Sequence, residues 1–185
     1  MDMLAHLWLP IVTSAAAMWI VSAIAWMALP HHKNDFKKLP DEKAFFAAFD
    51  TLKLPPGNYG FPECKTKESR NDPEVKRRWE AGELGIISVW GKVNMGKNMA
   101  LTFLVYLAVS FFIAYIASAA LKPGATFGQA FQVLGSAGVL AYCFSFIPSG
   151  IWFGQSNRSL LMGMIDGVAY GLVTGAIFAA MWPKA

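Results

Sequence analysis

Four long apolar runs constrain this chain more than any other feature of its sequence. They cover residues 4–29, 100–121, 127–147 and 159–182. Because a helix rises about 1.5 Å per residue, each run has roughly the length that crosses a hydrocarbon core of about 30 Å. Only 15% of the 185 residues are charged, whereas 55% are hydrophobic. The sequence therefore predicts an all-α integral membrane protein with four transmembrane helices.

The first run predicts a retained transmembrane helix rather than a secretory signal. A signal peptide carries positive charge ahead of a short apolar core. Here Asp2 and His6 come first, and the lysines follow the run. Pro10 predicts a bend in this helix, and Pro30 predicts its end.

Most of the charge lies in one polar segment of 68 residues, at positions 30–97, which holds 13 of the 16 Lys and Arg residues and 10 of the 12 acids. Asp41 and Asp72 predict two helix starts, because an aspartate can accept hydrogen bonds from the first turn of a helix. Leu54–Pro62 is rich in proline and glycine and is predicted to form turns. Leu84–Trp90 is predicted to form a short strand.

The basic residues also predict the orientation of the chain, because positively charged loops stay in the cytoplasm. One side of the predicted bundle carries Lys33, Lys37, Lys38, Lys43, Lys92, Lys97 and Arg158, and the other side only Lys122 and Lys184. We therefore expect the polar segment in the cytoplasm and both termini outside it.

The last apolar run carries a row of small residues, one at every fourth position: Gly163, Gly167, Gly171, Gly175 and Ala179. Residues without bulk let two helix backbones approach closely in a bilayer, so the row predicts a packing seam. The general abundance of glycine in transmembrane helices is the plainer explanation. The row leaves three partners open, namely another helix of this chain, a second copy or a different protein. Within the chain, the small residues Ser110, Ala114 and Ser118 make the second run one candidate.

Asp166 is the only charged residue within the four runs. Such an acid marks a proton path, an ion site or a partner contact, and Tyr170 lies one turn further on the same helix face. The alternative is that Asp166 reaches interfacial water or pairs with Arg158 or Asn157 of the preceding loop. We favour the alternative on sequence grounds, because a single acid without a second charge in the membrane makes a poor relay.

His31, His32 and Cys64 form the one set of residues that suggests a metal site. Adjacent histidines point in different directions on regular structure, and their spacing to Cys64 fits no metal-site pattern. The other cysteine, Cys143, is far away in the sequence and completes no CxxC motif. The sequence therefore predicts no cofactor.

Residues 91–98 match the phosphate-binding motif G-x-x-x-x-G-K-S/T at every position except the last. Asn98 stands where the motif requires a hydroxyl that holds Mg²⁺. A turn before a membrane helix is the favoured interpretation. The net charge of +4 is modest and concentrated in one segment, so we expect no nucleic-acid partner.

The chain resembles a family of small bacterial four-helix inner-membrane proteins that has no assigned activity. The similar segments are Leu29-Pro30-His31-His32-Lys33, Asn94-Met95-Gly96, Ile151-Trp152-Phe153-Gly154 and Ile165-Asp166-Gly167. The resemblance covers nearly the whole chain and implies the bacterial inner membrane, so that the termini, placed outside by the charge distribution, would be periplasmic. It singles out His31, Gly96, Trp152 and Asp166 as positions to mutate.

These observations lead to an expected function without catalysis. The chain is predicted to be a membrane subunit or assembly factor that contacts the bilayer and packs against a larger membrane complex, or against itself, through its last helix. The alternative is a small transporter or ion-conducting homo-oligomer that uses Asp166. A membrane enzyme or metal protein that uses His31, His32 and Cys64 is the least favoured hypothesis.

Overall fold

The computed structural model describes residues 2–184 and divides them into two units according to their internal contacts. The first unit comprises the described residues up to Phe36 and those from Met95 onward, and the second comprises Lys37–Asn94. The predicted polar segment at 30–97 therefore begins too early, since residues 30–36 belong to the first unit. They do so because histidine and aspartate side chains in this stretch bond to the last helix.

The first unit is helical, and four of its helices are long and apolar enough to span a membrane, which agrees with the predicted number. These candidate spans are Trp8–Met27 (α2), Met95–Ala120 (α6), Phe127–Trp152 and Asn157–Ala180 (α9). The third span is continuous in the chain but not regular. It consists of α7 (Phe127–Val139), the π-helical turn η2 (Leu140–Phe144) and α8 (Ile147–Trp152).

Two prolines act differently from each other at the helix ends. A short helix, α1 (Asp2–His6), precedes α2, and the break falls at Leu7. Pro10 cannot donate to residue 6 and its ring crowds that carbonyl, which accounts for a break one turn earlier. The predicted third run ends at residue 147, before Pro148, but the span continues to Trp152, because Pro148 stands in the first turn of α8, where a missing N–H costs nothing.

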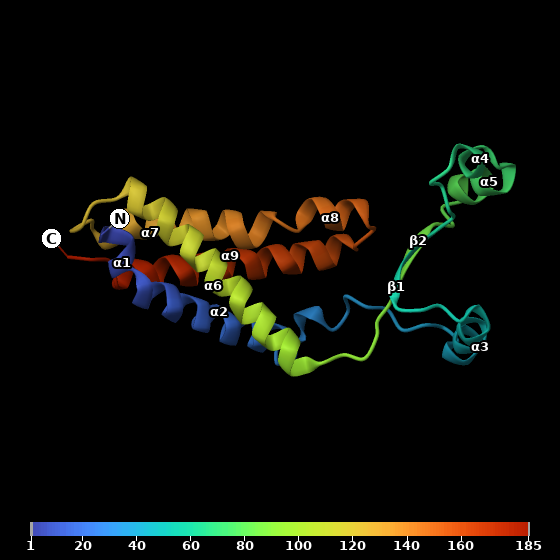
Figure 1. The fold of residues 1–185 in the computed structure, drawn as a ribbon, viewed down its shortest axis with the longest axis horizontal. Coiled ribbons are helices and arrows are strands. Elements are labelled where there is room, and N and C mark those ends of the chain that lie inside the picture. Colours follow the sequence, from blue (N-terminus) through green and yellow to red (C-terminus); the bar gives the residue numbers. More distant parts are fainter. Residues whose placement is uncertain (1, 185) are drawn as a thin grey trace. The chain divides into compact units, whose positions relative to one another are not determined.

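The core of the first unit forms where α9 lies along the third span and α2 packs against both α6 and α9 (Figure 1). Phe178, Leu134 and Leu7 are fully buried there. Large apolar side chains on the outside of the spans remain exposed, among them Phe112 and Ile116. That distribution is the one expected of helices that face lipid rather than water.

The glycine row of α9 faces the third span of the same chain. A Cβ atom at Gly175 would come within 2.6 Å of the Cα of Gly135, and one at Gly167 within 2.5 Å of the Cα of Cys143. A Cβ at Gly171 would collide with the Val139 backbone. Of the partners that the sequence left open, the third span faces this row rather than the second run, because Gly135 and Gly138 let its backbone approach closely.

The second unit contains three helices and one two-stranded sheet: α3 (Glu42–Leu52), β1 (Gly57–Phe61), α4 (Lys67–Asn71), α5 (Pro73–Glu80) and β2 (Gly85–Val89). Both predicted helix starts are confirmed. Asp41 accepts a hydrogen bond from the backbone of Ala44, and Asp72 accepts from those of Glu74 and Val75. The predicted strand at 84–90 is β2.

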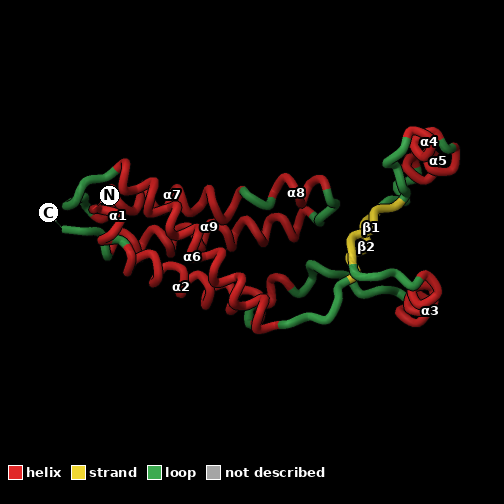
Figure 2. The backbone as a smooth tube through the Cα atoms, in the orientation of Figure 1, coloured by secondary structure: helices red, strands yellow, loops and turns green. Residues whose placement is uncertain are grey.

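The turns predicted at Leu54–Pro62 are partly wrong, because Gly57–Phe61 forms strand β1. This strand lies beside β2 (Figure 2) and pairs with it antiparallel. The register runs from Gly57 opposite Val89 to Phe61 opposite Gly85. The ring of Phe61 occupies the space that a side chain at residue 85 would need. The hydrogen bonds of a partner strand that lies far along the chain thus override the weak strand propensity of glycine.

Candidate functional site

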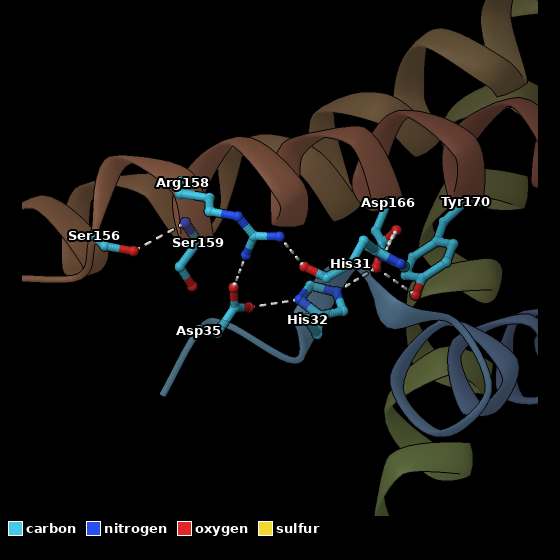
Figure 3. Close-up of polar contacts among 8 residues, drawn as sticks. All are labelled: His31, His32, Asp35, Ser156, Arg158, Ser159, Asp166 and Tyr170. Carbon is cyan, nitrogen blue, oxygen red and sulfur yellow. Dashed lines mark hydrogen bonds and ion pairs between the residues drawn. The ribbon is translucent and has the colours of Figure 1, made fainter. Parts of the chain in front are cut away.

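Three side chains from two distant segments meet in the first unit: His31, His32 and Asp166 (Figure 3). Nε2 of His31 lies 3.0 Å from Oδ1 of Asp166, and Nε2 of His32 lies 2.8 Å from Oδ2. One ligand atom of each residue lies within 4.8 Å of the other two. The side chains are largely withdrawn from solvent, with exposures of 21% for His31, 5% for His32 and 13% for Asp166.

A single tight turn places both imidazoles on one carboxylate. Pro30 opens the 3₁₀ helix η1 (Pro30–His32), and Leu29 before it is extended, as a residue that precedes proline should be. The two rings stand 4.2 Å apart at 42°. Adjacent histidines were expected to diverge, but one isolated turn lets both reach the two oxygens of Asp166.

His32 lies between two carboxylates. Its Nδ1 is 2.6 Å from Oδ2 of Asp35, and its ring stacks on Trp26 with the ring centroids 4.0 Å apart. Burial lowers the pKa of His32, but the hydrogen bonds to Asp166 and Asp35 outweigh burial and raise that pKa above its ordinary value. Each ring nitrogen faces a carboxylate oxygen, so each must carry a proton or face another positive ion.

Arg158 joins this cluster through Asp35 rather than through Asp166. It donates to Oδ1 of Asp35 at 3.1 Å and to the backbone oxygen of His31 at 2.8 Å. The expectation that Asp166 pairs with Arg158 or Asn157 is replaced by its two histidine contacts. With ordinary charges, two carboxylates and one guanidinium leave the cluster with one net negative charge when both imidazoles are neutral.

Tyr170 extends the cluster toward the bundle interior. Its hydroxyl donates to Oδ2 of Asp166 at 3.4 Å, and its ring meets that of Tyr142 edge to face, with the centroids 6.1 Å apart. A cavity of about 290 Å³ adjoins these groups. Its lining comprises Trp26, His32, Asp35, Tyr142, Phe146, Gln155, Ser159, Gly163, Asp166, Gly167 and Tyr170. From Ser159 to Tyr170 the cavity follows about 16 Å of α9.

Each candidate span buries one hydroxyl that lacks a partner in the part of the chain that the structure describes: Ser14, Ser110, Tyr142 and Thr174. The Tyr142 hydroxyl lies beside those of Ser110 and Thr174 without the geometry of a hydrogen bond. Within the described chain, none of the four oxygens has a hydrogen-bond partner. Each unpaired hydroxyl costs about 1–3 kcal/mol when buried, so a bound water or ion would stabilise this cluster.

Cys64 belongs to the second unit, where its thiol donates to the backbone oxygen of Pro62. The residue that completes the histidine pair is Asp166, which was predicted to act apart from the histidines. Asp35 and Trp26 were missed altogether. The spacing of His32 and Asp35, three residues apart, was the signal available for Asp35.

Comparisons of the chain with protein-family models, curated proteins and solved structures find no match. The resemblance to small bacterial inner-membrane proteins therefore stays a prediction, and the function must be inferred from the geometry of the site.

Proposed function

We propose that this chain is a small multi-pass membrane protein that moves a cation across the bilayer, with Asp166 as the residue that binds it. One observation carries the proposal: Asp166 accepts a hydrogen bond from Tyr170, whose ring meets that of Tyr142, and each of the four candidate spans buries a hydroxyl that has no partner among the described residues. Buried polar groups without partners are costly in a bilayer, so several of them in one helix bundle indicate a path or binding site.

The charge of the cluster also favours a cation. Asp35 and Asp166 contribute two carboxylates, and Arg158 balances one of them. A positive ion at the histidines would neutralise the remaining negative charge in a place where water is scarce, which strengthens electrostatic attraction. The cavity at Asp166 and Tyr170 offers that ion a route of entry.

The orientation of the path belongs to the same proposal. Lys33 and Arg158 lie at the end of the bundle where the cavity reaches Gln155 and Ser159. Because positive residues stay in the cytoplasm, we place this mouth, together with Lys37–Asn94, on the cytoplasmic side of a bacterial inner membrane, and both termini on the other side.

Flux into proteoliposomes tests the proposal. Vesicles that hold purified protein and a pH-sensitive dye, or a fluorescent indicator for Zn²⁺, should report entry of a cation when a gradient is imposed. Asp166→Asn should abolish that entry, whereas Asp50→Asn, at an exposed acid of the second unit, should leave it unchanged. If Asp166→Asn passes protons and Zn²⁺ at the parent rate, the residue has no part in transport.

A second candidate, the non-catalytic subunit, is favoured by the second unit alone. No residue of Lys37–Asn94, all of it described, is buried, and Trp79, Trp90 and Phe46 expose more than half of their surface. A unit without a core gains stability when it docks on another surface. The α9 glycines do not support this candidate, because the third span fills their groove.

Mild solubilisation followed by native electrophoresis tests the subunit hypothesis. The parent should migrate within a larger assembly, and Trp79→Ser together with Trp90→Ser should release it, while flux through Asp166 stays the same. Migration of the parent as a lone monomer would contradict a subunit role and leave the transport proposal untouched.

A further inference from the structure

We propose that the cation bound at Asp166 is a divalent first-row transition metal, held by Nε2 of His31, Nε2 of His32 and the carboxylate of Asp166. This inference rests on the proposed function, because it names the chemical class of the ion that the path carries. It is carried by the convergence of two imidazole nitrogens and one carboxylate within 4.8 Å.

The two nitrogen–oxygen distances are close to the separation of ligand atoms around one small ion. Ligand atoms around a tetrahedral metal at about 2.0–2.1 Å lie about 3.3 Å from one another. The two Nε2 atoms are 3.0 and 2.8 Å from the Asp166 oxygens. Outward movements of a few tenths of an ångström in these two pairs, with the two Nε2 atoms, which lie within 4.8 Å of each other, brought to a similar separation, would admit the ion in place of the protons between nitrogen and oxygen.

The surroundings of His32 are those of a metal ligand. A ligating histidine usually gives its other ring N–H to a carboxylate, which fixes the ring and leaves the ligating nitrogen unprotonated. Asp35 accepts from Nδ1 of His32 at 2.6 Å and is held in turn by Arg158. Trp26 stacks on the ring at 6° and limits its rotation. Asp35 is thus a positioning residue for His32.

The donor set selects the class of metal. Two imidazoles suit zinc, copper, nickel, cobalt and iron, whereas Mg²⁺ and Ca²⁺ require cages of oxygen atoms. Three protein ligands leave a fourth position open, as in catalytic zinc sites, where a water or substrate occupies that position. The cavity beside Asp166 and Tyr170 supplies space for a water or an incoming group there. These features indicate a site that can load and release its ion.

Binding of Co²⁺ and Zn²⁺ to the purified full-length protein tests the site. Titration calorimetry should show one ion per chain, and bound Co²⁺ should give the visible absorption of a site with nitrogen ligands. His31→Gln and Asp166→Asn should each weaken binding by more than about 100-fold, since loss of a ligand exceeds the 10–100-fold effect of losing a supporting group. The chain has one other histidine, His6, so His6→Gln is the matched control. It should bind Co²⁺ and Zn²⁺ as tightly as the parent does.

Asp35→Asn separates the positioning role from a general loss of fold. It should weaken Co²⁺ binding by about 10–100-fold and alter the cobalt spectrum, while helix content stays unchanged. Flux of protons that depends on Asp166 without any binding of Co²⁺ or Zn²⁺ would overturn the metal site and leave the transport proposal standing. Stoichiometric binding of metal without any flux would establish the site and overturn the transport proposal.

Discussion

Nε2 of His32 lies 2.8 Å from Oδ2 of Asp166, and this contact joins residues that are 134 positions apart in the chain. It attaches the turn after the first span to the middle of the fourth. The exposures of the two side chains are only 5% and 13%, so the pair is shielded from water. We therefore expect loss of this contact to lower the stability of the first unit. A second contact links the same two segments, because Arg158 of α9 donates a hydrogen bond to Asp35, which in turn contacts His32.

Removing His32 should destabilise the first unit. His32→Ala leaves the carboxylates of Asp35 and Asp166 without their shared partner, and breaking a buried charged pair costs about 3 kcal/mol or more. A dye that reacts with the buried thiol of Cys143 reports unfolding, if Cys64 is first changed to serine. His6→Ala is the control. An unchanged melting temperature for His32→Ala would mean that the contact does not hold η1 to α9.

Larger side chains in the glycine row should destabilise the bundle. The loss of stability should be greater where the glycine faces backbone atoms than where it faces a side chain. Gly175→Leu would press on the backbone of Gly135, which cannot move aside, so we expect a loss of about 3 kcal/mol or more. Gly163→Ala meets only the ring of Phe146 and should cost less. The measurement is the thermal midpoint in detergent, and Gly128→Ala, with no atom within 4 Å of its added carbon, is the neutral reference.

The hydroxyl cluster should separate stability from transport. Thr174→Val keeps the shape of the side chain and removes an oxygen that has no partner within the described chain, so stability should stay the same or rise by about 1 kcal/mol. Cation flux should fall, because the path loses a polar group. Ser118→Ala, at a hydroxyl that bonds to the backbone of Tyr115, should change neither quantity. Unchanged flux in Thr174→Val would remove the cluster from the path.

Thiol labelling in intact cells should establish the orientation. Cys64 is half-exposed in the second unit, so a membrane-impermeant maleimide should reach it only after the cytoplasmic side has been opened. A cysteine introduced at Lys184, beyond α9, should react without that opening. Labelling of Cys64 in intact cells would reverse the proposed topology and put the mouth of the cavity outside.

The sequence by itself determined the elements whose causes are local. Four runs of about twenty apolar residues predicted the four candidate spans, because length and hydropathy alone decide whether a helix can cross a bilayer. Asp41 and Asp72 predicted the starts of α3 and α5, since a helix cap involves only neighbouring backbone groups. Strand β2 was predicted because its own residues favour a strand. Strand β1 was not, because it forms only by pairing with β2, which lies far along the chain.

Only the tertiary structure decided which distant residues meet. The glycine row predicted a seam, but the backbone of Gly135 and Gly138, rather than the small residues of α6, fills it. Asp166 stood alone in the sequence, and its histidine partners appeared only when η1 folded against α9. The physical reason is that hydrophobic periodicity and capping act over a few residues, whereas a buried carboxylate takes whichever donors the packed helices bring within 3 Å.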